Sequence, residues 1–424
     1  MKNRPALVYA DVNGNIFDWP ALEMAGASAN EWKRPSSAEL IPLPEGSELF
    51  LLPERIPVGF NPTTGNFEPL PSDPFDPAKS VRAVAAFISP AYTHLYYTAY
   101  RAAPGAPLLP LFAYTAVGWL NGGFVVPALR IDSDQRQDFR NFDPKAIKRN
   151  AGRRMKADPQ NRLLQHLGKC ALTYGCPAAR NLFMNRWEAP LPTSPECNAR
   201  CIGCISRQEG SGLCATQDRI TFVPTPDEIC GVAIPHLQKA SRAVVSFGQG
   251  CEGEPLLQAK TLEASISIMR KSTGRGTINL NTNGSLPNEV EKLCRAGLQS
   301  IRVSMNSARP EYYDKYFRPR GYCFDDAKRS ICVVKANGGF ASVNYFIFPG
   351  FTDQESEFNA LRKLISETRL DMIQMRNLNI DPAWYLQQMS PDLTEKKLGI
   401  RKMISHIRNE FPDVKLGYFN PPLD

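Results

Sequence analysis

SPECNARCIGC, residues 194–204, is the stretch of this chain that decides its fold and its chemistry. It holds Cys197, Cys201 and Cys204, with three residues between the first two cysteines and two residues between the last two. An iron–sulfur cluster that only carries electrons takes a protein ligand on each of its four irons, so three thiolates in one loop leave one iron open. We therefore predict that these cysteines are metal ligands of a [4Fe–4S] cluster whose open iron serves a reaction.

The cysteine spacing leaves two alternatives open. One is a structural zinc site in which Cys214 supplies the fourth thiolate. The other is a non-catalytic iron–sulfur protein, an electron carrier or a sensor. A zinc site alone leaves unexplained the polar loops later in the chain, which are described below.

The use of cysteine also bears on the cellular compartment. The chain has eleven cysteines in 424 residues, and an odd number argues against complete disulfide pairing. The first apolar stretch reaches only Ala10 before Asp11, which is too short for a secretory signal. Because cytoplasmic thiols stay reduced, we expect a cytoplasmic protein whose clustered cysteines bind metal.

Composition indicates a folded protein of more than one domain. The hydrophobic fraction of 43% and the charged fraction of 22% are typical of folded chains, and 424 residues exceed the usual size of one core. The uncharged run 102–128 contains four prolines and the turn sequence Asn121-Gly122-Gly123. We predict a β-hairpin of 114–120 with 124–129 here, and no membrane span.

The pattern along the chain predicts four segments. Short apolar runs broken by Pro and Gly make residues 1–140 a β-rich N-terminal domain of unknown role, and residues 141–184 form a basic, helical linker. Asp143 and Pro144 predict its first helix, whose basic side chains form either a solvated face or a patch for nucleic acid or an acidic substrate. Residues 185–385 form an α/β barrel domain, and residues 386–424 a C-terminal helical extension.

Strands and helices alternate after Cys204. The expected strands are 242–247, 277–280, 300–304, 342–348 and 372–375, and the expected helices are 255–270, 287–296, 325–337, 353–368 and, in the extension, 393–410. Such alternation predicts a parallel sheet with crossover helices that closes into most of a barrel. Polar loops follow four of these strands, at 248–255, 281–284, 304–307 and 349–353, so we expect them to converge on one face.

With these motifs in order, the chain resembles the radical S-adenosylmethionine (radical SAM) superfamily. The cysteine triplet has the family spacing, 253–256 is similar to the family's glycine-glutamate-proline motif with Glu252 in place of its first glycine, and Thr282-Asn283-Gly284 is typical of the next strand end. The resemblance implies a partial (β/α)6 barrel that binds a [4Fe–4S] cluster and S-adenosylmethionine (SAM). It also implies reductive cleavage of SAM to a 5'-deoxyadenosyl radical, which abstracts a hydrogen atom from a substrate not identified by the sequence.

Cofactor contacts follow from the resemblance and from the chemistry of SAM. The SAM amino group calls for a carboxylate, which Glu254 supplies unless it only caps a helix, and the ribose calls for small polar side chains such as Ser304 and Asn306. The SAM carboxylate calls for a cation, with Arg302 or Arg376 as candidates. The expected cofactor-binding residues are Gly253, Glu254, Pro255, Asn283, Ser304, Asn306 and Phe348.

Two positions depart from the simplest prediction. Most relatives carry an aromatic residue before the third cysteine, where this chain has Gly203, so we expect Phe348 or Phe351 to support the adenine instead. Cys251 lies in the loop expected to face the cofactor and is the candidate catalytic residue, for hydrogen-atom donation or cluster ligation, although a lone cysteine is most often a buried apolar side chain.

Other cysteines and the histidines give a weaker signal. The cysteines flanking the triplet match no spacing typical of a second cluster, and the four histidines show no metal spacing; these are Cys170, Cys176, Cys214, Cys230, His94, His166, His236 and His406. The resemblance implies an external electron donor such as flavodoxin or ferredoxin. The substrate stays open between a small molecule and a polymer.

Overall fold

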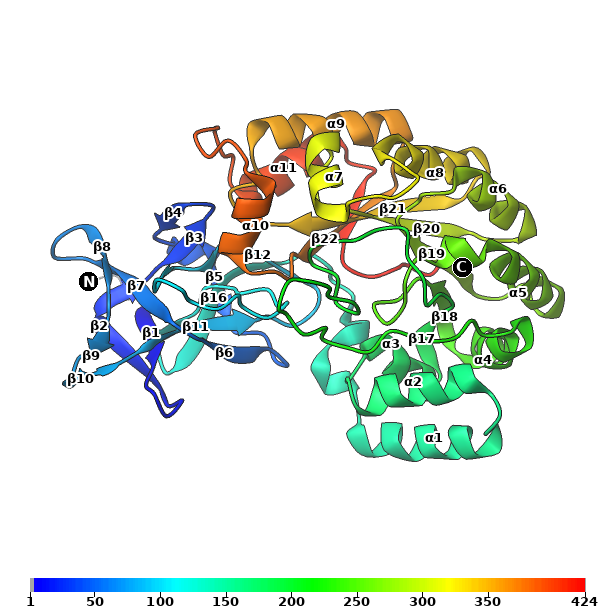
Figure 1. The fold of residues 1–424 in the computed structure, drawn as a ribbon, viewed down its shortest axis with the longest axis horizontal. Coiled ribbons are helices and arrows are strands. Elements are labelled where there is room, and N and C mark those ends of the chain that lie inside the picture. The colour runs from blue at the N-terminus through cyan, green and yellow to red at the C-terminus, as the bar shows by residue number, and fades with distance from the viewer. Residues whose placement is uncertain (1–3, 424) are drawn as a thin grey trace.

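The computed structural model describes residues 4–423, and these form a β-rich part and an α/β part that lie side by side (Figure 1). The α/β part is built on a parallel sheet of seven strands in the order β17-β18-β19-β20-β21-β22-β23. This arrangement confirms the predicted partial barrel. The strands are β17 (Arg186–Leu191), β18 (Ser241–Phe247), β19 (Thr277–Thr282), β20 (Ser300–Met305), β21 (Phe340–Ile347), β22 (Met372–Asn377) and β23 (Lys415–Gly417).

Crossover helices cover the outer side of this sheet (Figure 1). They are α4 (Pro226–Lys239), α5 (Ala259–Ser272), α6 (Pro287–Ala296), α8 (Phe324–Ala336), α9 (Glu355–Thr368) and α11 (Ile400–Glu410). α4 begins at a capping box, in which the Thr225 hydroxyl accepts from the Glu228 amide and the Glu228 carboxylate accepts from the Thr225 amide. The expected helix 255–270 begins instead as a short 3-10 turn, η4 (Pro255–Gln258), before α5.

The C-terminal segment belongs to the sheet. β23 pairs in parallel with β22 through Met372 and Lys415, so the sheet continues beyond residue 385, where we expected a separate helical extension to begin. α11 starts at Ile400, later than the expected 393, because Gly399 precedes it in a non-helical conformation. Two more short helices, α7 (Pro310–Phe317) and α10 (Pro382–Met389), follow β20 and β22.

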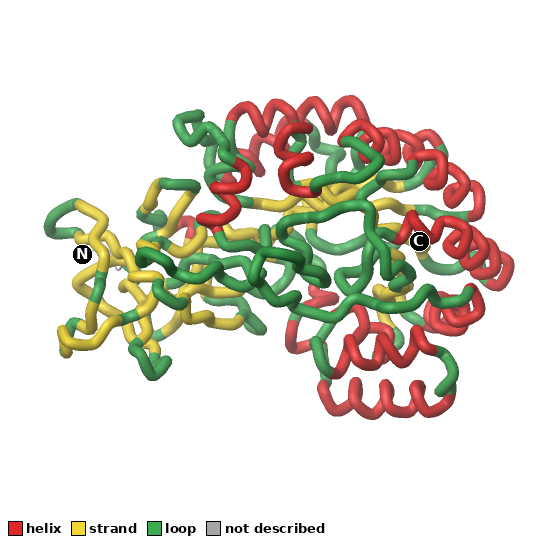
Figure 2. The backbone as a smooth tube through the Cα atoms, viewed as in Figure 1, coloured by secondary structure: helices red, strands yellow, loops and turns green. Residues whose placement is uncertain are grey.

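The N-terminal part is antiparallel and β-rich, as predicted (Figure 2). Its main sheet contains the expected hairpin, in which Gly118 pairs with Val125 and Leu120 with Gly123, although the first strand starts at Gly118 and not at 114. The strands of this sheet are β1 (Ala6–Ala10), β2 (Ile16–Met24), β5 (Leu40–Pro42), β6 (Glu48–Leu52), β7 (Arg55–Asn61), β8 (Asn66–Pro69), β11 (Arg82–Phe87), β12 (Tyr92–His94), β14 (Tyr100–Ala102), β15 (Gly118–Leu120) and β16 (Gly123–Arg130).

Three helices connect the two parts. They are α1 (Pro144–Ala157), α2 (Arg162–Leu172) and α3 (Pro177–Phe183). The Asp143 side chain accepts hydrogen bonds from the amides of Lys145 and Ala146, which is the predicted cap of α1. α2 presents one apolar face and buries Leu163, Leu164 and Leu167 among others, so it packs under the barrel as part of the core.

Buried polar contacts fix the β-rich part against the barrel. Arg55 on β7 forms an ion pair with Asp381 at 3.0 Å, with both side chains buried. Thr93 Oγ1 on β12 donates to the carbonyl oxygen of Met375 on β22 at 2.9 Å. The N-terminal part therefore lies against the last strands of the barrel. Across residues 4–423, no helix is both long and apolar enough to cross a membrane.

Candidate functional site

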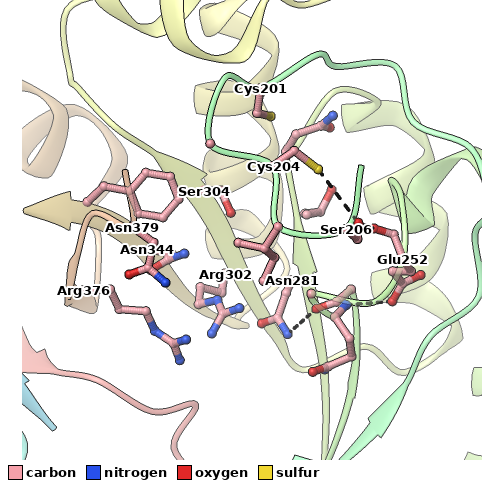
Figure 3. Close-up of a pocket in the computed structure, with 18 of the residues that line it drawn as sticks. Cys201, Cys204, Ser206, Glu252, Asn281, Arg302, Ser304, Asn344, Arg376 and Asn379 are labelled. Atoms are coloured by element: carbon pink, nitrogen blue, oxygen red, sulfur yellow. Dashed lines mark hydrogen bonds between the residues drawn. The ribbon is translucent and has the colours of Figure 1, made fainter. Parts of the chain in front are cut away.

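A cavity of about 500 Å³ lies within the barrel and reaches the loops that follow its strands (Figure 3). This volume is within the range of small-molecule and cofactor sites. All three cysteines of the triplet line it. Of the expected cofactor-binding residues, five line it as well: Gly253, Glu254, Pro255, Asn283 and Ser304.

Hydrogen bonds of its backbone and of a cysteine sulfur hold the cysteine loop in place. The amide of Ile202 donates to the carbonyl of Tyr316 at 3.0 Å, and Arg219 Nη2 donates to Cys204 Sγ at 3.3 Å. Burial raises the pKa of the Cys197 thiol to about 11, with the Glu254 carboxylate as a further cause. Thiolates at such a position require a cation beside them, and three of them in one loop fit a [4Fe–4S] cluster with one open iron. Cys214 is exposed and does not line the cavity, so its position does not favour the zinc alternative.

Glu252, where the family motif has glycine, ties two loops together. Its buried carboxylate accepts from the amides of Thr193 and Ser194 at 2.7 and 3.0 Å, just before the cysteine loop. Its other oxygen accepts from the Gln249 amide at 2.7 Å. Burial raises the pKa of this carboxyl to about 7. Glu252 thus fixes the end of β17 to the loop after β18.

Gly253 and Glu254 complete this junction. The amide of Gly253 donates to the Ser194 carbonyl at 2.6 Å, and the amide of Glu254 donates to the Glu196 carbonyl at 2.8 Å. A side chain at residue 253 would place its Cβ only 1.9 Å from the oxygen of Glu196, so the close approach of the two backbones requires glycine.

The Glu254 carboxylate is held in a fixed orientation. It accepts from the amides of Leu256 and Asn283 at 2.9 and 2.8 Å and from the Thr282 hydroxyl. Burial raises the pKa of Glu254 to about 7. Glu254 therefore caps η4 and, at the same time, lines the cavity, so both interpretations of this residue describe its position.

Tyr316 accounts for glycine at position 203. A Cβ at residue 203 would lie 2.5 Å from the Tyr316 hydroxyl oxygen, so this tyrosine fills the space of a side chain there. The aromatic residues that line the cavity are Tyr316, Phe317, Phe346, Tyr418 and Phe419. They include neither Phe348 nor Phe351, which we expected beside the adenine.

Asn306 and Phe348 lie outside the cavity, in the core behind it, and the candidate site excludes both. The side-chain amide of Asn306 donates to the Tyr312 carbonyl at 3.1 Å, and the Phe348 ring packs against Tyr385 with centroids 4.7 Å apart. Each comes just after the end of its strand, where the side chains no longer alternate between the two faces.

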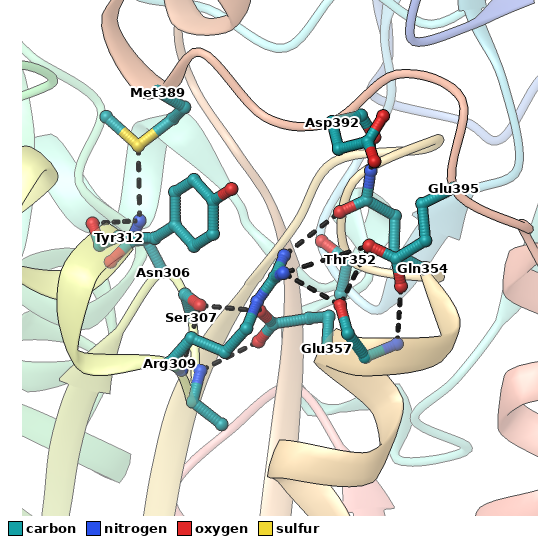
Figure 4. Close-up of polar contacts among 12 residues, drawn as sticks. Asn306, Ser307, Arg309, Tyr312, Thr352, Gln354, Glu357, Met389, Asp392 and Glu395 are labelled. Atoms are coloured by element: carbon teal, nitrogen blue, oxygen red, sulfur yellow. Dashed lines mark hydrogen bonds and ion pairs between the residues drawn. The ribbon is translucent and has the colours of Figure 1, made fainter.

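A buried network holds the chain that follows β20 (Figure 4). The Glu357 carboxylate accepts from Ser307 Oγ at 2.6 Å, from the Ala308 amide at 2.7 Å and from Arg309 Nε at 2.8 Å. Glu357 is fully buried and forms an ion pair with Arg309. This network positions the loop after β20 and gives it a structural role.

Cys251 also lies outside the cavity. Its buried side chain is grouped with those of His166 and Cys170 on α2. Because it does not line the cavity, its position does not favour a role in hydrogen-atom donation or in ligation of the triplet's cluster.

Two arginines lie at the other end of the cavity from the triplet in this view (Figure 3). Arg302 on β20 donates to Gln374 at 3.2 Å, and Arg376 on β22 donates to the Tyr418 carbonyl at 2.9 Å. Within residues 4–423 neither forms an ion pair, and the Nε of each is buried without a hydrogen-bond partner. Burial and the charge of Arg376 lower the pKa of Arg302.

Polar side chains surround the arginines. Asn344 lines the cavity, and its Oδ1 is buried without a partner in the part of the chain that the structure describes. Asn420, from the C-terminal segment, donates to Glu188 at 2.7 Å and to Asn281 at 3.1 Å. No sequence pattern predicted that Tyr418 and Phe419 line the cavity, since they follow a strand of only three residues.

Comparisons with known proteins bear on this site. Residues 191–361 match the family model described as the radical SAM superfamily. A probable GTP 3',8-cyclase of Methanocaldococcus jannaschii is 33% identical over 141 residues, which cover 33% of this chain and 41% of that protein. The GTP 3',8-cyclase of Microcystis aeruginosa is 28% identical over 38% of this chain and 47% of that protein.

Solved structures also resemble the chain. The Streptococcus suis protein SuiB bound to its precursor peptide SuiA matches with a TM-score of 0.40 and 12% identity, over 61% of this chain and 53% of that protein. This chain spans less than half the length of the two curated relatives.

Proposed function

We propose that this chain, which belongs to the radical SAM superfamily, is an enzyme that uses SAM to act on a substrate held in the barrel. Its cofactors are the [4Fe–4S] cluster and the SAM of that family. One observation carries the proposal: Cys197, Cys201, Cys204 and Glu254 line a single cavity. When bound, the cofactors supply one-electron reductive cleavage of SAM to a 5'-deoxyadenosyl radical, which removes a hydrogen atom from the substrate.

The chain's own residues bind and orient SAM. The carboxylate of Glu254, fixed by its hydrogen bonds, offers negative charge to the ammonium group of SAM. Ser304 and Asn283 offer polar atoms to the ribose hydroxyls. The aromatic faces of Tyr316 and Phe346 offer an apolar surface to the adenine and shield the cavity from water.

SAM binding and cleavage test this function. In anaerobically reconstituted protein reduced with dithionite, we expect 5'-deoxyadenosine to form from SAM. Glu254→Ala should weaken SAM binding about tenfold or more, because it removes a charged contact, whereas Glu311→Ala, at an exposed position of α7, should leave SAM binding unchanged. Equal SAM affinity in the wild type and in Glu254→Ala would contradict the role of Glu254.

We further propose that the substrate carries an anionic group, a phosphate or a carboxylate, bound by Arg302 and Arg376. Two guanidinium groups that line one cavity and form no ion pair within residues 4–423 are costly unless an anion joins them. Guanidinium groups suit phosphate and carboxylate because they donate in pairs. GTP, which the names of the curated relatives include, bears phosphates of this kind.

Binding of different anions distinguishes a phosphate substrate from a carboxylate substrate. We expect GTP, pyrophosphate or succinate to raise the melting temperature of the cluster-loaded wild type. Arg302→Gln and Arg376→Gln should abolish the shift, while Arg101→Gln, an exposed residue of the N-terminal part, should keep it. A response to GTP and pyrophosphate alone would identify a phosphate substrate, and a response to succinate alone a carboxylate substrate; identical shifts in all variants would contradict the assignment.

The electron donor, we propose, meets the opposite side of the cysteine loop. A second cavity of about 220 Å³ is lined by the three cysteines and by five arginines. The arginines are Arg200, Arg207, Arg219, Arg318 and Arg320. Exposed cations beside the cluster favour an acidic protein donor, such as flavodoxin or ferredoxin, in the cytoplasm.

Charge reversal tests this docking face. Arg200→Glu with Arg320→Glu should slow SAM cleavage driven by reduced flavodoxin about tenfold or more, and should leave dithionite-driven cleavage unchanged, because a small reductant needs no docking. Equal rates with flavodoxin in both proteins would contradict this face.

A further inference from the structure

His166, Cys170 and Cys251 form a compact group of metal-ligating atoms outside the cavity. Their ligand atoms all lie within 4.8 Å of one another, and Cys170 Sγ lies 3.5 Å from His166 Nε2. His166 and Cys170 are four residues apart on α2, so both project from the same helix face. Cys251 comes from the loop after β18, which also carries Glu252 and Glu254.

The spacing fits a single ion. With Zn–S and Zn–N bonds of about 2.3 and 2.0 Å, neighbouring ligand atoms of a tetrahedral zinc site lie about 3.5–4 Å apart. The three atoms need to move little to reach that geometry. A [4Fe–4S] cluster holds each ligand on a different iron and therefore farther apart, so this group is suited to one metal ion.

The chemistry of the donors also suits a soft divalent ion. Hydrogen bonding with the Cys251 thiol and with His166 lowers the pKa of the Cys170 thiol, which favours the thiolate form that binds metal. Two sulfurs and one imidazole nitrogen are typical zinc ligands, and the fourth tetrahedral position remains for water. Cys170 and Cys251 are buried, and His166 is partly exposed, which leaves a path for the ion.

We propose that His166, Cys170 and Cys251 bind one Zn²⁺ ion. Binding forms two Zn–S bonds and one Zn–N bond and releases the proton of the Cys251 thiol. The ion fixes α2 to the loop after β18, outside the lining of the cavity. Since Glu252 in the same loop holds the chain before the cysteine triplet, the site stabilises the cofactor loop from behind.

Metal analysis tests the site. In protein purified anaerobically from zinc-supplemented cells, we expect about one zinc per chain in addition to cluster iron. Cys170→Ser, Cys251→Ser and His166→Gln should each lower the zinc content more than tenfold. Cys230→Ser, which alters a buried thiol on α4 outside the group, should keep the zinc, and so should Cys197→Ala, which removes a ligand of the triplet.

X-ray absorption at the zinc edge of the wild type makes the test independent of variant folding. Two sulfur ligands and at least one nitrogen ligand support the site. Absence of zinc, four sulfur ligands, a Cys170–Cys251 disulfide, or zinc retained in all three variants would overturn it. None of these outcomes depends on cleavage of SAM, so the site and the proposed function can fail separately.

Discussion

The buried charged groups at the two ends of the cavity differ in how many of their polar atoms have hydrogen-bond partners. At the cluster end, which we define by the triplet, Glu252 and Glu254, both carboxylates accept several hydrogen bonds from the backbone. At the arginine end, defined by Arg302, Arg376 and Asn344, each of these side chains keeps a buried polar atom without a partner in the described chain.

This difference distinguishes polar groups that support the structure from polar groups that are available to bind a ligand. Polar groups that are satisfied within the protein hold loops at fixed positions, as at the cluster end. Buried polar groups that lack partners cost free energy in the empty protein and recover it when a ligand supplies the missing atoms. This contrast supports our proposal that the cluster end positions the cofactors and the arginine end binds the substrate.

Removing a triplet thiol gives the largest expected effect. Cys201→Ala should abolish the cluster and all SAM cleavage, because the remaining two thiolates in the loop hold too few irons. Iron and sulfide analysis together with 5'-deoxyadenosine measurement check this. Arg302→Gln should keep the cluster intact, and loss of iron in that variant would break the separation of the two ends.

Gly253→Ala should have the next largest effect. The new Cβ would collide with the Glu196 carbonyl, so we expect a loss of about 1–3 kcal/mol in the free energy of unfolding, and a lower cluster content. Gly152→Ala on α1 is the matched control, since open space surrounds that position, and it should stabilise the helix by about 0.5–1 kcal/mol. Similar stability changes in both variants, measured by denaturant unfolding, would refute the tight junction.

At the arginine end, single substitutions should act on ligand binding alone. Arg302→Gln or Arg376→Gln should weaken binding of the responsive anion about tenfold to a hundredfold, the loss of a charge-assisted hydrogen bond. Titration calorimetry with SAM and with the anion checks both ends at once. An equal loss of SAM affinity would instead assign these arginines to the SAM carboxylate.

Substitution at position 203 should have the smallest effect, and a second substitution should partly reverse it. Gly203→Ala should destabilise the cysteine loop by about 1 kcal/mol or more because its Cβ meets the Tyr316 hydroxyl. In a Tyr316→Phe background, the same change should cost less, since the nearest ring carbon lies 3.4 Å away. Additive costs in the double-mutant cycle would show that the two residues are independent.

Much of the cluster end was predictable from sequence. The triplet, the motif at 253–255 and the strand-end loops are local patterns, and the rule that parallel strands end at one face brings them together. The direction of the Arg302 side chain was predictable in part, because the buried residues Ile301 and Val303 alternate with it along the strand and lie on the other face of the sheet.

The side-chain directions of Asn306 and Phe348, just beyond the ends of their strands, were not predictable. Asn306 and Phe348 follow the last residues of β20 and β21, where alternation no longer determines direction, and tertiary packing places both in the core. Cys251 follows β18, and its loop returns toward α2, a segment from another part of the sequence. The closing of the cavity by Tyr418 and Phe419 depends in the same way on long-range pairing of β23 with β22.

Formation of 5'-deoxyadenosine is the most direct measure of radical SAM chemistry in this chain. Dithionite-reduced wild type, Cys201→Ala and the Arg302→Gln/Arg376→Gln double variant are incubated with SAM without substrate. We predict product from the wild type and from the double variant, and none from Cys201→Ala. Wild-type protein that carries four irons per cluster and forms no 5'-deoxyadenosine would contradict it.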